Sequence, residues 1–338
     1  MRQIVISRSG GLDVLKIEKV PDPKPRKGEV LIKVKAAGLN FADILARQGL
    51  YPDAPKTPCV VGYEVSGIVE DVGEGVDKNL LNSSVLALTR FGGQAERVSV
   101  PVDQVFKKPE SLSFEQAASI PVVYLTAYGL LIAMGSLQAG ESVLIHNAGG
   151  GVGLAAIDIA KKYGAITYGT ASPSKHSFLK ERGLDYPIDY RTKDWLPILK
   201  ELTNDQGVEL IIDPIGGGHW KKSYNALRST GRLGMFGVSS ASATGLKGKY
   251  QMLMAVIQTP WFHPFSLLDK NKAVFGLNLG HLWHEVKKIT SWMNVILDGV
   301  EQGWVRPYVD KVFPFDQIAQ AHDHLESRKN TGKVILVP

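Results

Sequence analysis

A glycine-rich stretch, IHNAGGGVG at 145–153, limits the possible folds of this chain more than any other feature. It ends an apolar run and leads into 153–164, where apolar residues recur at helical spacing. Ala148, Gly150 and Gly153 match an A-x-G-x-x-G form of the dinucleotide-binding fingerprint. The start of the helix would offer backbone N–H groups to a pyrophosphate. The stretch therefore predicts a strand, a phosphate-binding loop and a helix, with a ligand-free glycine turn as the alternative.

The rest of the chain agrees with an α/β protein of two parts. From residue 142 to about 280, predicted strands alternate with helices, which indicates a doubly wound parallel sheet whose last strand lies in 272–280. Residues 1–110 instead contain short strands and turns, typical of a β-barrel or sandwich, with one short helix at 41–49. A final strand at 333–338 needs partners, so we expect the C-terminus to return to the first part.

Composition excludes several classes of protein. With 338 residues, 44% hydrophobic and 21% charged, the chain has an ordinary globular composition and room for two domains. A net charge of +6 is compatible with a lysine-rich surface or a basic cleft for an anionic cofactor, and nucleic-acid binding is less favoured. Cys59 is the single cysteine, which suits a reducing compartment, and the first residues do not resemble a signal peptide. We therefore expect a cytoplasmic protein.

Two apolar segments need an explanation. Residues 116–140 carry no charge, but Pro121 and several polar residues interrupt them, and Ser113 with Gln116 resembles a capping box. We therefore expect a helix buried between domains and no transmembrane segment. The second segment, 250–268, is apolar and aromatic, and its prolines prevent one continuous helix. It fits a subunit interface or lid, with substrate lining or peripheral membrane contact as alternatives.

The residues after the second predicted strand of the parallel sheet indicate which dinucleotide binds. An NAD site usually has an acidic residue there, to accept a hydrogen bond from the ribose 2′-hydroxyl. Here Ser172, Ser174 and Lys175 occupy the region. Two hydroxyls and an ammonium suit a 2′-phosphate, so we predict NADP(H) as the cofactor. In the alternative interpretation, Ser174 only caps the next helix.

Several motifs along nearly the whole chain carry a resemblance to a known family: GLNFADILARQGLYP, GYEVSGIVEDVGEGV, AASIPVVYLTAYGLL, HNAGGGVGLAA, GTASPSKH and ESRKNTGKVILVP. With these motifs the sequence resembles the medium-chain dehydrogenase/reductase superfamily. Within it, the sequence is similar to the zinc-free quinone oxidoreductases, and it is most similar to their vesicle-amine-transport-protein branch. The resemblance implies a GroES-like catalytic domain at 1–122 and 296–338, and a Rossmann NADP-binding domain at 123–295.

The resemblance also implies the residues of the site. Asn40 would lie in the catalytic cleft, although it could simply cap the helix that follows, and Lys333 could lie on a solvated strand face. The remaining implied cofactor contacts are Thr126, Gly151, Val152, Tyr190, Gly237, Val238, Asn278 and Asn330, besides the loop and serine–lysine residues already named.

The sequence predicts no metal site. Zinc-dependent relatives place His beside Glu after a glycine, whereas here Tyr63 precedes Glu64, and tyrosine does not replace imidazole as an ordinary zinc ligand. Without a Lewis acid alcohol oxidation is difficult, but a quinone or an α,β-unsaturated carbonyl can accept hydride directly. Tyr51 and Tyr63 are the candidate hydrogen-bond or proton donors, with pocket wall as the alternative role.

Three functions remain open at this stage. The first is an NADPH-dependent reductase of quinones or enones. The second is a nucleotide-binding trafficking or interaction protein with little turnover, and the third, nucleic-acid binding, is the least favoured. By analogy with the family we also expect a homodimer, in which the edge strand of 272–280 pairs with its symmetry mate.

Overall fold

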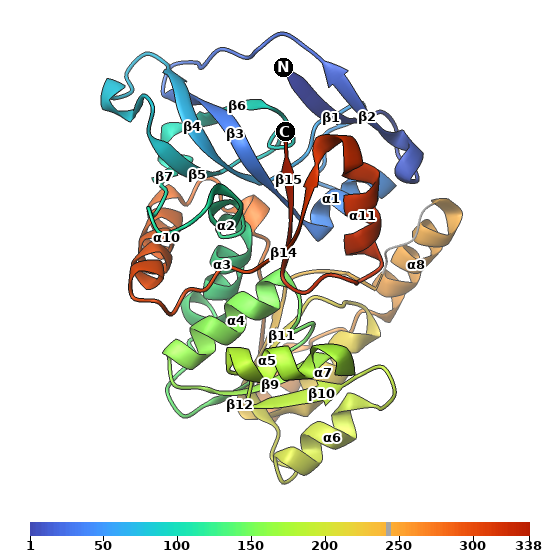
Figure 1. The fold of residues 1–338 in the computed structure, drawn as a ribbon. Helices are drawn as coiled ribbons and strands as arrows, with labels where there is room; N and C mark the ends of the chain where they lie inside the picture. Colours follow the sequence, from blue (N-terminus) through green and yellow to red (C-terminus); the bar gives the residue numbers. More distant parts are fainter. Residues whose placement is uncertain (241–244) are drawn as a thin grey trace.

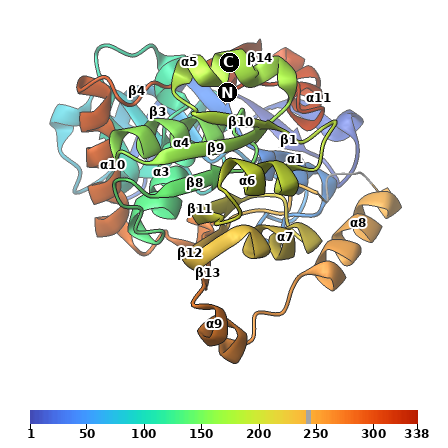
Figure 2. The same cartoon turned by 90° about the horizontal axis from the view of Figure 1, so that it is seen from below.

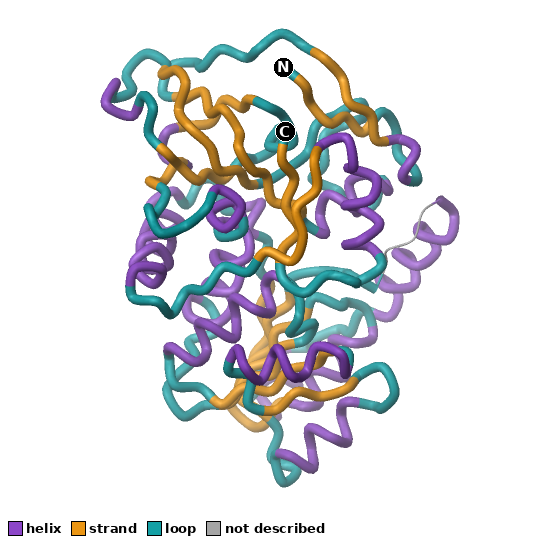
Figure 3. The backbone as a smooth tube through the Cα atoms, in the orientation of Figure 1, coloured by secondary structure: helices purple, strands orange, loops and turns teal. Residues whose placement is uncertain are grey.

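The computed structural model describes residues 1–240 and 245–338, and it has two parts that lie one above the other in Figure 1. The upper part contains antiparallel strands and both chain termini, and the lower part contains a parallel sheet between helices. Figure 3 shows that strands dominate the first part, whereas helices and strands alternate in the second. This is the α/β architecture that the sequence predicts.

The parallel sheet has six strands in the order β10-β9-β8-β11-β12-β13. In that order their bounds are Tyr186–Asp189, Ile166–Ala171, Ser142–Ile145, Val208–Asp213, Leu227–Met235 and Ala273–Gly276. The strand order reverses between β8 and β11, which is where doubly wound sheets open a crevice at the carboxyl ends of their strands. The predicted doubly wound sheet is confirmed, including its last strand.

Alternating side chains of these strands bury both faces of the sheet. Ile145 and Ile212 pack into the core shared with one set of helices, and Leu144 and Ile211 pack into the core shared with the other. The first set is α3 (Pro121–Tyr128), α4 (Gly151–Lys162), α5 (His176–Arg182) and α10 (Val286–Glu301), and the second is α6 (Trp195–Leu202) and α7 (Gly218–Ala226) (Figure 2). Apolar residues at successive strand positions therefore account for a sheet that is covered on both sides.

The antiparallel sheet follows the order β14-β15-β3-β4-β5-β7, with β6 also paired to β3. A separate antiparallel pair, β1 and β2, lies near the N-terminus. The bounds of β1 to β7 are Arg2–Ile6, Leu15–Lys19, Glu29–Leu39, Glu64–Val72, Ser84–Leu88, Arg97–Pro101 and Val105–Lys107, and those of β14 and β15 are Val309–Pro314 and Lys333–Val337. Because β15 pairs with β3, the predicted return of the C-terminus to the first part is confirmed.

Two helices pack beside this sheet. Helix α1 (Phe41–Gln48) ends at Gly49, whose φ of 72° is left-handed, as expected of a glycine that closes a helix. It packs against α11 (Ile318–Glu326), so that the two ends of the chain share one core. Side chains of α1 and of β15 thereby reach the same region, which becomes important for the site.

The uncharged segment 116–140 forms two helices instead of one. The predicted capping box of Ser113 and Gln116 is present at the start of α2 (Phe114–Ala118). Pro121, which has no N–H to continue a helix, then begins a new helix, α3 (Pro121–Tyr128), followed by a wider turn at Gly129–Ala133. Helix α3 packs against α4, α10 and β5, and is therefore buried between the two parts. Among the described residues, no helix combines the length and apolarity needed to cross a bilayer.

The second apolar segment extends away from the body. Helices α8 (Gly245–Gln258) and α9 (Pro264–Lys270) lie at the periphery in Figure 2. Trp261 between them is 89% exposed and Phe265 is 76% exposed. These values identify an uncovered apolar surface on this chain.

The predicted domain limits fall inside helices. Helix α3 contains the limit at 122/123, and α10 contains the limit at 295/296. Both helices pack into the core that includes β8. The division into two domains with these bounds stays a prediction.

Candidate active site between the two parts

The glycine-rich loop is as tight as its composition suggests. It joins β8 to α4, and Gly150 is the N-cap residue of that helix. A Cβ at Gly153 would lie 2.4 Å from the carbonyl oxygen of Asn147, and a Cβ at Gly150 would lie 2.7 Å from the Asn147 side-chain nitrogen. Since neither position has room for a side chain, the first N–H groups of α4 stay close to the loop surface, where a phosphate can approach.

The C-terminal segment lies directly on this loop. The Gly332 N–H donates to the Gly149 carbonyl at 2.8 Å, and Gly150 and Gly332 form an isolated parallel bridge. The Asn330 side chain donates to the Gly332 carbonyl at 2.8 Å, which holds the turn in shape. The phosphate loop and the strand that enters the antiparallel sheet are therefore one continuous surface.

Lys175 lies beside the loop as predicted from its position after β9. Its ammonium donates to the Asn330 carbonyl, and its aliphatic chain lies so close to Gly149 that a Cβ there would be 2.8 Å from the lysine Cδ. Burial lowers the pKa of Lys175, with a smaller opposing effect from the Asp310 charge and a lowering effect from Arg191. A partly desolvated ammonium at this place is available to pair with an anionic group.

The predicted 2′-phosphate site also includes two serines just before Lys175 in the sequence and a tyrosine further along the chain. The hydroxyls of Ser172 and Ser174 lie 3.3 Å apart. Ser174 lies inside a 3-10 turn, Pro173–Lys175, and the N-cap of α5 is Lys175, so the capping alternative for Ser174 is not found. Tyr190 follows β10 and is partly exposed. The next residue, Arg191, adds a second cation near Lys175, and the sequence interpretation missed it although it directly follows the predicted tyrosine.

A buried polar cluster joins the two ends of the chain. The Lys333 ammonium lies 2.5 Å from Glu64 Oε1 and donates to Asn40 Oδ1, also at 2.5 Å. Asn40 in turn donates from Nδ2 to Glu64 at 3.0 Å, and the second Glu64 oxygen accepts from the Val122 N–H at 2.7 Å. Lys333 is only 4% exposed, so the alternative of a solvated strand face is wrong. Every charge in this cluster has a partner, as buried charges require.

Asp43 extends the cluster toward the tyrosines. Its carboxylate accepts hydrogen bonds from the backbone N–H of Asn40 at 2.7 Å and of Gly62 at 3.0 Å. Asn40 stands at the N-cap of α1, as the capping alternative predicts, and its side chain also bonds to Glu64 and Lys333. Burial raises the pKa of Asp43 to about 7, against the lowering effect of these hydrogen bonds and of the Lys333 charge.

Tyr51 and Tyr63, the candidate donors, lie together in an aromatic group. Their rings meet edge to face, with centroids 6.1 Å apart, and Tyr63 also contacts Phe91 at 5.7 Å. The Tyr63 hydroxyl is buried and has no hydrogen-bond partner among the described residues. Burial raises the pKa of both phenols, that of Tyr51 to about 12. Both side chains are therefore neutral hydrogen-bond donors near pH 7.

The other predicted contacts lie on α3, on α4 and in the chain that follows β12. Thr126 is buried on α3, the helix whose Val123 lies against Gly151 at the start of α4. Val152 follows in the first turn of α4. Gly237 and Val238 follow β12, next to the chain that leaves β11, since a Cβ at Gly237 would lie 3.1 Å from the Pro214 carbonyl oxygen.

Asn278 is the predicted contact whose place is most informative. It follows β13, and its side chain donates to Asp53 Oδ2 at 3.1 Å. Asp53 belongs to the loop after α1, which also carries Tyr51. This hydrogen bond therefore connects the parallel-sheet part to the loop of Tyr51. Asp53 was not predicted, because nothing in the sequence relates residues 225 positions apart.

A second titratable cluster, also unpredicted, lies where β8 and β11 end. His146, Asp213 and His219 offer ligand atoms that all lie within 4.8 Å of one another. These atoms bond to their neighbours: Asp213 Oδ2 lies 2.6 Å from His219 Nδ1 and accepts from the Ser223 hydroxyl at 2.7 Å. The Trp195 indole N–H donates to His219 Nε2 at 3.1 Å, and burial lowers the pKa of His146 to about 3. The arrangement is that of an internally satisfied hydrogen-bond network.

Comparison with known proteins identifies the class. Residues 26–110 match the alcohol dehydrogenase GroES-like domain, and residues 182–336 match the zinc-binding dehydrogenase family. Together with the fold and the glycine loop, these matches show that the chain belongs to the medium-chain dehydrogenase/reductase superfamily.

Individual relatives indicate which branch of the superfamily this chain is similar to. The human synaptic vesicle membrane protein VAT-1 homolog is 40% identical, over 100% of this chain and 86% of its own length. Human quinone oxidoreductase is 30% identical, over 100% of this chain and 98% of its own length. The crystal structure of Escherichia coli quinone oxidoreductase, complexed with NADPH, has a TM-score of 0.88 at 29% identity and full coverage of both chains. The predicted branch, close to the VAT-1 homologs and quinone oxidoreductase, is confirmed.

Proposed function

We propose that this protein is a reductase that uses NADPH, without a metal, to reduce a quinone or an α,β-unsaturated carbonyl compound. The observation that carries the proposal is the position of Lys175 against Gly149 of the phosphate loop, where an NAD site would have a carboxylate. The quinone oxidoreductase relatives, one of them solved with NADPH, support both the reaction class and the cofactor.

The residues present fit such a dinucleotide. Gly150 and Gly153 leave no side chain between the loop and a pyrophosphate, and the N-terminus of α4 supplies N–H donors. Lys175, with the hydroxyls of Ser172 and Ser174, would hold the 2′-phosphate. When bound, the cofactor supplies a hydride; the protein contributes orientation, exclusion of water and a hydrogen-bond donor for the oxygen that becomes negative.

The donor role falls to the tyrosines. Tyr63 keeps a buried hydroxyl without a partner among the described residues, next to the paired Glu64. An oxygen of the acceptor that reached this hydroxyl would satisfy it, and a neutral phenol is a suitable donor to a developing oxyanion. Asn40, bonded to both Glu64 and Lys333, would keep the neighbouring charges fixed.

Cofactor oxidation tests this proposal. The purified protein is mixed with NADPH or NADH and a panel of quinones and enals, and the loss of cofactor absorbance is followed. We expect turnover with at least one acceptor, a preference for NADPH and no stoichiometric zinc by elemental analysis. NADH preference, or a requirement for zinc, would contradict the proposal.

The exposed α8–α9 segment favours a second candidate function, that of a nucleotide-binding interaction protein with little turnover. Exposed side chains there include Trp261, Phe265 and Leu268, and the relatives named vesicle membrane proteins make peripheral membrane contact a natural form of this candidate. NADPH binding without turnover on any acceptor, together with sedimentation on lipid vesicles, would favour it. A salt-dependent shift of labelled single strands would instead support nucleic-acid binding.

The remaining expectations concern assembly and location. Strand β13 is the edge of the parallel sheet, and we propose that it pairs with the same strand of a second copy in a homodimer. A monomeric mass by light scattering would contradict the dimer. We also propose a cytoplasmic location, for which microscopy of a tagged protein is the test.

A further inference from the structure

One carboxylate links the loop that carries Tyr51 to a turn that follows the parallel sheet. Asp53 Oδ2 accepts a hydrogen bond from Asn278 Nδ2 at 3.1 Å and lies 2.9 Å from His281 Nε2. Both partners come from one short stretch, because Asn278 is the N-cap of the 3-10 turn Leu279–His281. Two side chains of this turn therefore converge on a single oxygen of the opposite part.

The same carboxylate acts on Tyr51, two residues earlier in the chain. After burial, the negative charge of Asp53 is the largest cause that raises the pKa of Tyr51, and a hydrogen bond from Asn278 acts in the opposite direction. A Cβ at Gly280 would lie 3.5 Å from the Tyr51 hydroxyl oxygen, so the phenol lies against the turn itself. The pKa of Asp53 is held low, first of all by its hydrogen bond with His281. The Asp53 carboxylate therefore interacts with the Tyr51 hydroxyl on one side and with the His281 ring on the other.

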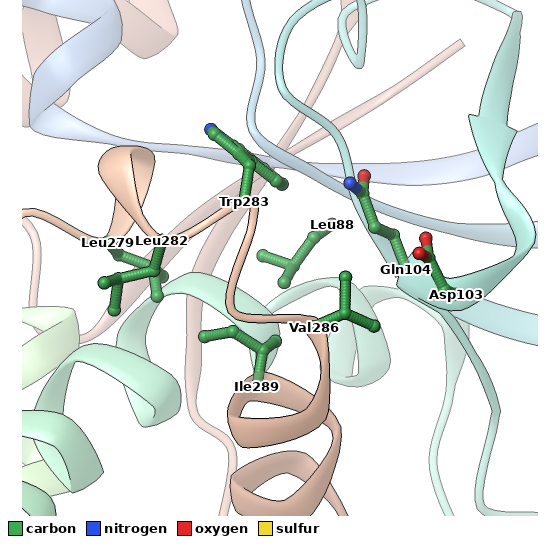
Figure 4. Close-up of a pocket in the computed structure, with 8 residues that line it drawn as sticks. All are labelled: Leu88, Asp103, Gln104, Leu279, Leu282, Trp283, Val286 and Ile289. Carbon is green, nitrogen blue, oxygen red and sulfur yellow. The ribbon is translucent and has the colours of Figure 1, made fainter.

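Apolar packing holds the rest of this segment. Leu279, Leu282 and Trp283 pack against the core that contains Leu88, at the end of β5, and Ile289 of α10, and the same side chains line a pocket (Figure 4). Figure 4 shows these side chains converging from the turn, from α10 and from the antiparallel part. The backbone of the turn is therefore anchored by apolar contacts that involve neither Asp53 nor His281.

The other charged groups near His281 already have partners. On its own segment, Glu285 lies 3.1 Å from the Lys288 ammonium and 3.9 Å from His284. From the opposite part, the negative charge of Asp43 raises the pKa of Tyr51. Among the described residues, Asp53 is the acidic group in contact with the His281 ring.

We propose that Asp53 and His281 are positioning residues, which hold the Tyr51 hydroxyl at the acceptor end of the cleft by bridging the two parts of the molecule. This inference rests on the proposed reductase function, which it deepens. Asp53 keeps the phenol against the turn at Gly280, and His281 with Asn278 fixes the carboxylate. Neither residue needs to touch the acceptor; both act through Tyr51.

The first test does not depend on turnover. Tyrosine labelled with ¹³C at the ring carbon that bears the hydroxyl gives an NMR signal for Tyr51, assigned with Tyr51→Phe. We expect His281→Gln and Asp53→Asn to shift this signal, because both change the environment of the hydroxyl. His284→Gln is the matched control, since that exposed ring lies three residues further on and its ion pair is with Glu285 of its own segment. An unchanged Tyr51 signal in folded His281→Gln protein overturns the proposal.

The second test separates positioning from general stability. We expect His281→Gln to lower kcat/KM for the acceptor by about fivefold, mainly through KM, while the dissociation constant of NADPH stays the same. In a Tyr51→Phe background the same substitution should cause no further loss, because its effect passes through the phenol. Independent, multiplying losses would overturn the proposal. If no acceptor is turned over, the reductase function fails, whereas the NMR result still decides whether the bridge positions Tyr51.

Discussion

The two ends of the cleft are built in different ways. At the nucleotide end, the phosphate loop has no room for side chains, and Lys175 already bonds to a backbone carbonyl. At the proposed acceptor end, Tyr51, Tyr63 and Phe91 form an aromatic group, in which the Tyr63 hydroxyl has no hydrogen-bond partner among the described residues. The first end is preformed by backbone, which suits a ligand of constant shape. The second keeps one donor free in apolar surroundings, which suits acceptors that share an oxygen but differ elsewhere.

A buried ion pair lies between these ends, so its removal should have the largest effect. Lys333→Met leaves the buried Glu64 carboxylate without its cation, and we expect the free energy of unfolding to fall by about 3–5 kcal/mol. Urea denaturation measures this change. The double variant Glu64→Gln/Lys333→Met should recover part of the loss, because no charge is then left unpaired. A loss below about 1 kcal/mol would show that the cluster does not hold the two ends together.

The stability of the protein should depend on pH through Asp43, which lies near the proposed acceptor end. Burial raises its pKa from 3.8 to about 7 in the folded protein. The folded state therefore binds this proton more tightly than the unfolded chain, and stability falls as the pH rises between these values. Between pH 5 and pH 7 we expect the free energy of unfolding to decrease by on the order of 2 kcal/mol, and to decrease by less in Asp43→Asn. Urea denaturation at pH 5 and pH 7 is the measurement, and an identical pH dependence in the variant would contradict this assignment.

Lys175→Ala should affect the nucleotide end alone. Removal of a charge-assisted hydrogen bond to the 2′-phosphate should weaken NADPH binding by about 10- to 100-fold and leave NADH binding nearly unchanged. Calorimetry with both cofactors measures the difference. Lys180→Ala is the control, because Lys180 is an exposed lysine on α5, the helix that begins directly after Lys175. Equal losses for NADPH and NADH would mean that Lys175 does not contact the 2′-phosphate.

Tyr63→Phe should have the smallest effect on stability and should act at the acceptor end alone. The lost hydroxyl has no partner in the part of the chain that the structure describes, so we expect the free energy of unfolding to stay constant or rise by about 1 kcal/mol. If the hydroxyl donates to the acceptor, kcat/KM should nevertheless fall by about tenfold, with NADPH affinity unchanged. Tyr128→Phe on α3 is the control. A variant with full activity would restrict Tyr63 to lining the pocket.

Local patterns in the sequence were sufficient to predict the parallel sheet and the glycine-rich loop that joins β8 to α4. Apolar periodicity predicts the strands and helices of the parallel sheet, and the spacing of Gly150, Gly153 and Lys175 follows from short-range geometry. Pro121 shows the limit of this approach. The capping box and the apolar run that follows it predict one helix, whereas the structure has two.

The acceptor end could be predicted only in part. Tyr51 and Tyr63 were predicted as candidate donors, but Phe91 was not. The pairing of Glu64 with Lys333 and of Asp53 with His281 joins residues far apart in the chain. No local propensity encodes such contacts, since they exist only after both sheets have formed. The network of His146, Asp213 and His219 was missed for the same reason.

The hydrogen bond from Gly332 to Gly149 has a consequence for how the molecule can move. It fastens the strand that closes the antiparallel sheet to the loop on which the pyrophosphate would rest. On the opposite edge, where Asp53 meets the turn at 279–281, the two parts are joined by side chains alone. We therefore expect a relative movement of the two parts to break the side-chain contacts of Asp53 more readily than the backbone hydrogen bond at Gly149.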